Sequence, residues 1–180
     1  PSEWQTAAGG FVVQGDVATT ADGDGDGGDG GSFSLAFDTV STPDVAVEAA
    51  ATGDDGQDLF VGARETEVDG DSAGYYCDVL WKPAGDGGGF GLSIGTTPIG
   101  NRTSRTIAPG SLHRLMLFAK GDVLGCILDG GKPQLRNDTQ QPDGETAELG
   151  STRNGGSRPS NSTRSPMSGA PAGGAMRGIH

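Results

Sequence analysis

The strand-like segment 73–82, AGYYCDVLWK, holds the side chains best suited to binding chemistry. Successive residues of a strand point to opposite faces of a sheet, so Tyr76, Asp78 and Lys82 share one face. An aromatic ring stacks on the C–H faces of a sugar, and a carboxylate accepts hydrogen bonds from its hydroxyls. Core packing explains the other aromatic residues of the segment at least as well. We therefore predict Tyr76, Asp78 and Lys82 as ligand contacts.

Arg64 ends an earlier predicted strand, over 59–64. Its guanidinium could bind a ligand carboxylate or hydroxyl, which makes it the fourth predicted ligand contact. It could equally pair with a surface Asp, and the ion pair is the favoured interpretation of the two.

Asp alternates with Gly in segment 22–31, DGDGDGGDGG. This pattern places the carboxylates of Asp22, Asp24, Asp26 and Asp29 on a flexible backbone, as calcium loops do. The first half fits an EF-hand loop, but Phe33 stands at the twelfth position, where a bidentate Glu is required, and no flanking helices are predicted. A solvated low-complexity loop is the favoured interpretation, and a weak Ca²⁺ site is the alternative.

Cys77 and Cys126 are the only two cysteines, and both fall on predicted strands. Two buried free thiols are the default expectation. A disulfide is the alternative if the two strands are neighbours and the compartment is oxidising. His113 has no His or Cys cluster near it in the sequence, so it gives no evidence for a metal site. The sequence also leaves its distance from any Ser and Asp unknown, so it predicts no catalytic triad.

The segment 112–130, LHRLMLFAKGDVLGCILDG, predicts a β-hairpin that organises the other elements. Its first arm alternates through Leu115 and Leu117, a turn at Gly121-Asp122 reverses the chain, and the second arm ends at a turn at Asp129-Gly130. Period-two alternation predicts further strands over 32–37, 44–51, 59–64, 73–82 and 90–94.

The hairpin stretch 109–130, PGSLHRLMLFAKGDVLGCILDG, resembles the signature hairpin of concanavalin A-like (laminin G-like) jelly-roll domains, particularly those related to the 3-keto-disaccharide hydrolases. Upstream segments follow in the order that this family shows: DVAVEAAAT from Asp44, LFVGARE from Leu59, AGYYCDVLW from Ala73 and GFGLSIG from Gly89. The resemblance implies an all-β antiparallel sandwich. This fold hosts lectins, adhesion modules and hydrolases, so it leaves the chemistry open.

The acidic segment 65–71, ETEVDGD, resembles the catalytic E-x-D-x-E strand of sandwich-fold β-glucanases, whose spacing sets its acids on one face. The segment departs from that motif because its last acid is Asp71 and Gly70 weakens the strand. We therefore expect a solvated loop here. If the chain is a hydrolase, as the family resemblance implies, Glu65, Glu67 or Asp78 are the candidate acid/base groups.

The net charge of −12 is unevenly spread, because residues 1–148 contain all 24 acidic residues. An acidic body argues against nucleic acid as a partner. No apolar run approaches the roughly 18 residues that a membrane helix requires.

Residues 150–180 are rich in Ser, Gly, Arg, Pro and Asn and show no periodicity, which predicts a disordered tail after a sandwich domain of residues 1–149. Segment 144–149 could supply part of a closing strand.

These observations favour a non-catalytic, lectin-like carbohydrate-binding module of a secreted or cell-envelope protein, with a glycan or glycoconjugate as its partner. A glycoside hydrolase of the 3-keto-disaccharide type is the first alternative. A structural or adhesion domain, attached to other domains of a larger chain, is the second.

Overall fold

The computed structural model describes residues 5–8, 11–14, 17–20, 33–39, 42–68, 71–82, 88–140, 144 and 146–152, and the side chains within 42–66, 73–82, 88–140, 144 and 146–151. The predicted Ca²⁺ loop with Asp22, Asp24, Asp26 and Asp29, the Glu67 side chain and the predicted tail from residue 153 lie outside these ranges. Within them, no helix is long and apolar enough to span a membrane.

The regular elements of the described residues are all β-strands, and all their pairings are antiparallel. The larger sheet runs in the order β1 (Gln5–Ala8), β4 (Phe33–Thr39), β14 (Thr146–Thr152), β6 (Asp58–Val68), β7 (Asp71–Leu80), β8 (Gly89–Ile94) and β10 (Thr103–Ser104), with β9 (Thr97–Pro98) beside β8. The smaller sheet runs in the order β13 (Gln134–Asn137), β12 (Val123–Leu128), β11 (Leu112–Lys120) and β5 (Val45–Thr52). A separate hairpin joins β2 (Phe11–Gln14) to β3 (Val17–Thr20).

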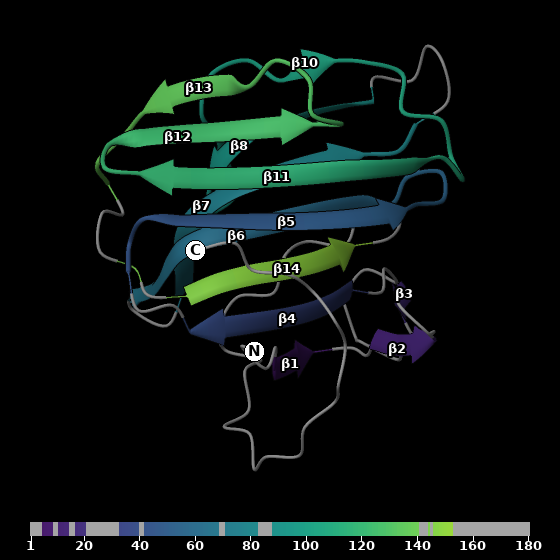
Figure 1. Ribbon diagram of the computed structural model, residues 1–180, viewed down its shortest axis with the longest axis horizontal. Coiled ribbons are helices and arrows are strands. Elements are labelled where there is room, and N and C mark those ends of the chain that lie inside the picture. Colours follow the sequence, from purple (N-terminus) through teal and green to yellow (C-terminus); the bar gives the residue numbers. More distant parts are fainter. Residues whose placement is uncertain are drawn as a thin grey trace.

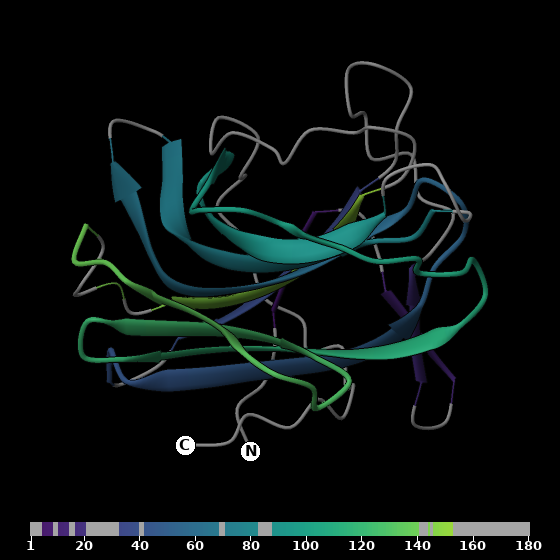
Figure 2. The same ribbon diagram turned by 90° about the horizontal axis from the view of Figure 1, so that it is seen from above.

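The two sheets stack face to face as a sandwich, with the smaller sheet in front in Figure 1. Seen from above, the larger sheet curves away from the smaller one, so its outer face is concave (Figure 2). The predicted all-β antiparallel sandwich is therefore confirmed.

The core fills the space between the sheets with the inward-facing residues of both. Alternation along β7 sends Tyr75, Cys77 and Val79 into this core, and Trp81 follows on the same side. The smaller sheet contributes alternate residues of β5, β11 and β12 to the same cluster: Val45, Val47, Leu115, Leu117, Ala119, Leu124, Cys126 and Leu128. The face that Tyr75, Cys77, Val79 and Trp81 share by alternation is thus the buried core face.

The central hairpin forms as predicted, with β11 paired to β12 from Leu115↔Leu128 to Lys120↔Val123. Its second turn has the left-handed conformation at two successive residues, with φ of 55° at Asp129 and 66° at Gly130. Gly131 closes this turn by donating its N–H to the Leu128 carbonyl at 3.0 Å. Asp and Gly are the residues that tolerate such a turn most readily.

The predicted solvated loop over 65–71 is wrong at both of its ends. Strand β6 continues to Val68, and β7 begins at Asp71. A β-bulge between Ala63 and Thr66 absorbs a register shift, with Arg64 at φ 56°. Glu65 is buried on this bulge rather than solvated.

A closing strand is present. Strand β14 pairs with β4 on one side and with β6 on the other, so it lies inside the larger sheet rather than at its edge. The strand continues through Thr152, beyond the 144–149 segment in which the sequence indicated it.

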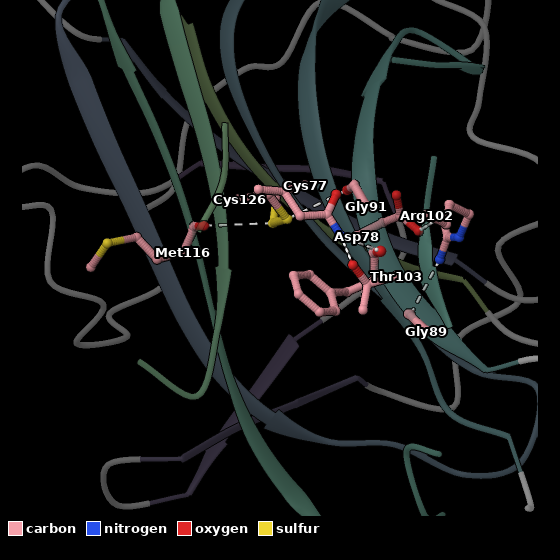
Figure 3. The surroundings of a disulfide bond; sticks show 10 residues. Cys77, Asp78, Gly89, Gly91, Arg102, Thr103, Met116 and Cys126 are labelled. Carbon is pink, nitrogen blue, oxygen red and sulfur yellow. Dashed lines mark hydrogen bonds and ion pairs between the residues drawn. A yellow bond between two sulfur atoms is a disulfide. The ribbon is translucent and has the colours of Figure 1, made fainter. Parts of the chain in front are cut away.

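Cys77 and Cys126 form a disulfide between the two sheets, so the default expectation of two free thiols is wrong (Figure 3). Both side chains face the core from opposite layers, β7 and β12, and their Cα atoms are 5.4 Å apart, within the usual disulfide range. The two strands are neighbours across the sandwich rather than along a sheet. Sequence alternation alone does not reveal that kind of proximity.

Removing this cross-link should destabilise the fold strongly. A bridge between residues 49 apart in sequence restricts the unfolded chain by about 4 kcal/mol in the chain-entropy model. We expect the Cys77→Ala/Cys126→Ala double variant to lose free energy of unfolding of this order in urea denaturation, because both alanines remain compatible with the core. Wild-type protein with reductant should shift likewise, and equal midpoints for oxidised, reduced and variant protein would contradict the prediction.

Candidate functional site

The concave outer face of the larger sheet carries buried side chains that are not part of the core. Phe60 and Tyr76 are almost fully buried, yet they alternate with core residues and therefore point away from the smaller sheet. Their rings meet edge to face, with centroids 5.9 Å apart. The Tyr76 hydroxyl donates to Glu148 Oε2 at 3.4 Å. This face therefore combines aromatic rings with buried carboxylates.

Glycines make room for these rings on the neighbouring strands. Gly62 is paired with Tyr76 on one side and with Glu148 on the other. A Cβ at position 62 would lie 2.8 Å from Tyr76 Cε1 and 3.0 Å from Glu148 Cβ. The Tyr76 ring therefore lies flat across the β6 backbone, and any larger residue at position 62 would displace it.

Arg102 and Asp78 form an ion pair at the edge of this face (Figure 3). Asp78 lies on β7 with a side chain only 7% exposed, whereas the Arg102 side chain is 39% exposed. Arg102 Nη2 also donates to the Gly89 carbonyl at 3.3 Å. A Cβ at Gly91 would lie 2.9 Å from Arg102 Cγ, so the arginine stem lies across the β8 backbone. The guanidinium is thus held in place by a buried carboxylate and a carbonyl while one side faces solvent.

Of the four predicted ligand contacts, the structure places Tyr76 and Asp78 on the outer face, in neighbouring rows. Arg64 is buried, donates from Nε to the Pro43 carbonyl at 2.7 Å and lies 3.5 Å from Asp44. These contacts agree with the ion pair to an Asp that was the favoured interpretation of Arg64. Lys82 follows β7 and lies 3.7 Å from Asp55 Oδ1 at the surface.

Asp78 and Glu65, the two acid/base candidates whose side chains the structure describes, are not brought together along the sheet. Asp78 is paired with Phe60, and Glu65 lies five residues further along the same strand β6. At the strand rise of about 3.3 Å per residue, these positions are roughly 13–17 Å apart. Glycosidase carboxyl groups are separated by about 5–10 Å.

Two residues of this face were missed by sequence reasoning. Glu148 could have been found, because Ala147 and Leu149 flank it in an alternating segment and both face the core. Arg102 precedes β10, which has only two residues and is too short to show an alternation of apolar and polar residues. Only the pairing of Thr103 with Phe90 shows that Arg102 reaches β8.

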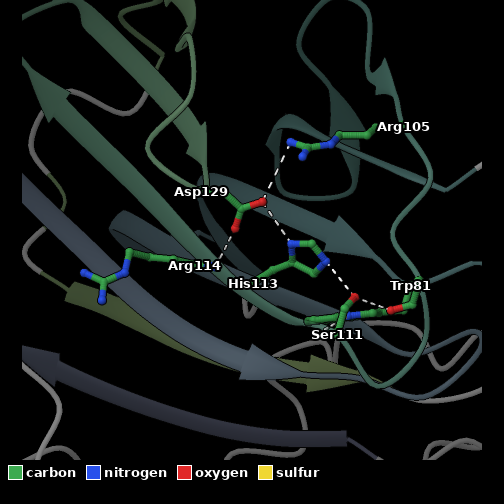
Figure 4. A network of polar contacts seen from close by, with 7 residues as sticks. Trp81, Arg105, Ser111, His113, Arg114 and Asp129 are labelled. Carbon is green, nitrogen blue, oxygen red and sulfur yellow. Dashed lines mark hydrogen bonds and ion pairs between the residues drawn. The ribbon is translucent and has the colours of Figure 1, made fainter.

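A second polar cluster lies at one end of the sandwich, where the 99–111 connection meets β11 (Figure 4). His113 Nε2 is 2.7 Å from Ser111 Oγ, and His113 Nδ1 is 2.9 Å from Asp129 Oδ2. The other carboxylate oxygen of Asp129 accepts the Arg114 N–H at 3.0 Å. Arg105 Nη1 lies 3.7 Å from the same carboxylate. The structure thus brings together a Ser, a His and an Asp whose proximity the sequence could not show.

The environment of Asp129 lowers the pKa of its carboxyl below the ordinary value of 3.8. Burial alone would raise this pKa. The hydrogen bonds from the Arg114 N–H and from His113, with the positive charges of His113 and Arg105, outweigh that effect. Asp129 therefore remains ionised through the neutral range and orients the imidazole.

Among the described side chains, no group of three or more His, Cys, Asp and Glu could hold a metal ion.

The class of fold is that of the concanavalin A-like jelly rolls, as the hairpin resemblance implied. The solved structures that resemble it include a carbohydrate-binding module, CBM66, from Bacillus subtilis, at 16% identity, a TM-score of 0.58 and coverage of 85% of this chain and 93% of that one. A legume lectin-like domain from Entamoeba histolytica matches at 13% identity and a TM-score of 0.53, over 86% of this chain and 83% of that one. An apo Crh5 transglycosylase matches at 16% identity and a TM-score of 0.52, over 83% of this chain and 62% of that one.

No protein-family model matches the sequence, and no curated protein matches it significantly. The likeness is therefore one of fold, and the relation to 3-keto-disaccharide hydrolases stays a prediction.

The lowered pKa of Asp129 predicts how its contribution to stability depends on pH. Because the folded-state pKa lies below the unfolded-state value near 3.8, this contribution is fully present above that value and is lost as the pH falls through the folded-state pKa. We expect Asp129→Asn to lower the urea midpoint at about pH 7. At about pH 2 the variant should differ little from wild type.

Asp122→Asn, in the exposed hairpin turn, is the control and should show no such convergence. A deficit for Asp129→Asn that is equal at both pH values would contradict this account of the carboxylate.

Proposed function

We propose that this chain is a carbohydrate-binding module that receives a glycan over the outer face of its larger sheet, beside Arg102. The observation that carries the proposal is the Arg102–Asp78 pair. A solvent-facing guanidinium is held on this face by a carboxylate that is itself buried. A salt bridge made only for stability gains little from such an arrangement, because desolvation of the acid opposes the attraction.

The held guanidinium suits a ligand rich in hydroxyl oxygens. Arginine carries five N–H donors in a planar fork, and its contacts with Asp78 and Gly89 engage two of them. A fixed donor loses little conformational entropy when it binds, which favours recognition of weakly held sugar hydroxyls. Asp78 balances the charge, so the site does not require an anionic sugar.

Phe60, Tyr76 and Glu148 lie beneath the same outer face, but at 1%, 2% and 4% exposed they are not accessible to a ligand. The proposal therefore rests on Arg102. Two of the matching structures are named as a carbohydrate-binding module and a legume lectin-like domain.

A secreted or cell-envelope location fits this function. The disulfide between Cys77 and Cys126 closes the core, and disulfides persist mainly in oxidising compartments. Such modules are commonly attached to other domains, which would be the remaining partners of this chain.

Replacing Arg102 should weaken glycan binding without unfolding the domain. We expect wild-type protein to bind members of a glycan array that includes 3-keto disaccharides, and Arg102→Ala to lose at least about tenfold in affinity, equivalent to about 1.4 kcal/mol. Titration calorimetry on the best array ligand measures the loss, with and without Ca²⁺.

Arg114→Ala is the matched control, because Arg114 pairs with Glu48 in the same way on the smaller sheet. It should bind as wild type does, and urea denaturation should show that both variants are folded. Equal affinity for Arg102→Ala and wild type would refute the site, and sugar release from bound glycans would instead support the hydrolase alternative.

A further inference from the structure

We propose that Ser111 is a nucleophilic serine, activated by His113 and Asp129, that accepts the acyl group of small carboxylic esters. The proposal does not depend on glycan binding, because it concerns the end of the sandwich rather than the outer face. It rests on the connectivity of the three side chains, which is that of a nucleophile, a general base and an orienting carboxylate (Figure 4).

The contacts run in the order that this chemistry needs. Ser111 Oγ is 2.7 Å from His113 Nε2, so the hydroxyl proton can pass directly to the imidazole. His113 Nδ1 is 2.9 Å from Asp129 Oδ2, which fixes the tautomer with its proton on Nδ1 and leaves Nε2 free to accept. Triads are recognised by such roles and geometry rather than by sequence order or fold.

The backbone holds each member in place. The Trp81 indole Nε1 donates to the Ser111 carbonyl at 3.2 Å, and the Ser111 N–H donates to the Ala108 carbonyl at 3.1 Å. Asp129 sits in the left-handed turn after β12 and is anchored there by the Arg114 N–H. These contacts preorganise the nucleophile and the orienting acid before any ligand arrives.

The imidazole is partly shielded from water. The His113 side chain is 14% exposed and lies on the core side of β11, with its ring centroid 6.2 Å from that of Trp81. A base in such a position interacts more strongly with Asp129 than it would in bulk water. Asp129 stabilises the imidazolium that forms when His113 takes the serine proton.

The serine hydroxyl has two acceptors within reach, and this gives the site a resting and a reactive arrangement. Ser111 Oγ also contacts the Ala108 carbonyl. With the proton directed to Ala108, Oγ is not deprotonated. With the proton directed to His113 Nε2, the base can remove it. Rotation about one side-chain bond interconverts the two arrangements.

The reaction balances without any other reagent. Ser111 Oγ attacks the ester carbonyl carbon, the Oγ–C bond forms, and the hydroxyl proton passes to His113 Nε2. The C–O bond to the leaving alkoxide breaks, and His113 returns the proton to it as the alcohol. Water then repeats the sequence on the acyl-serine and releases the acid.

The test uses the oxidised full chain and a fluorophosphonate probe, which reacts when Oγ–P forms as P–F breaks. We expect one adduct, mapped to Ser111 by peptide mass spectrometry, and its absence in Ser111→Ala. His113→Gln should slow labelling by about 100-fold or more, the usual contribution of a general base. Asp129→Asn should slow it as well, since Asn tolerates the left-handed turn but does not balance an imidazolium.

Ser104→Ala is the control, because Ser104 is an exposed serine on β10, and it should label as wild type does. Urea midpoints identify variants that have unfolded. If His113→Gln unfolds, Asp129→Asn still tests the proposal. No adduct on wild type, an adduct on another residue, or labelling of Ser111 that neither folded variant slows would overturn the proposal. Hydrolysis of p-nitrophenyl acetate above background, lost in Ser111→Ala, would support it.

Discussion

The burial of strand β7 on both of its faces is the constraint on which the rest of this structure depends. One face gives Tyr75, Cys77 and Val79 to the core, and the other places Tyr76 and Asp78 on the outer face. An antiparallel sheet of a two-layer sandwich can leave its outer face solvated. On β7 the outer-face residues Tyr76 and Asp78 are buried, so their polar groups need partners, and Glu148 and Arg102 provide them from β14 and from the segment before β10.

The same constraint explains the glycines of the larger sheet. A ring lying flat on a sheet displaces the side chain of the neighbouring strand, so Gly62 stands beside Tyr76 and Gly91 stands under Arg102. Glycine in a strand interior weakens the strand, and such positions commonly mark a close approach by another group. On the core side the two layers are joined covalently through Cys77 and Cys126, which fixes β7 against β12. Strand β7, whose Asp78 pairs with Arg102, is therefore joined to the smaller sheet by a covalent bond as well as by packing.

Most of the fold could be predicted from period-two alternation and turn chemistry. The two alternating faces of β7, the β11–β12 hairpin and its Asp129-Gly130 turn follow from local rules, because each depends on residues close in sequence. Which face of β7 is buried did not follow from the sequence. The bulge at Arg64 did not follow, since nothing in the local pattern shows where a register shifts. The disulfide and the Arg102–Asp78 pair also did not follow. Each joins residues whose proximity depends on how the layers stack or on a strand of only two residues.

The connection from Ile99 to Ser111 serves both polar regions at once. It brings Arg102 to the outer face, Arg105 to Asp129, and Ser111 to His113, and its two-residue strand β10 pairs with β8. An insertion or deletion of one residue between Arg102 and Ser111 would therefore alter two sites together while leaving the sandwich intact. Related sandwiches that differ in the length of this one connection should diverge in surface chemistry far faster than in architecture.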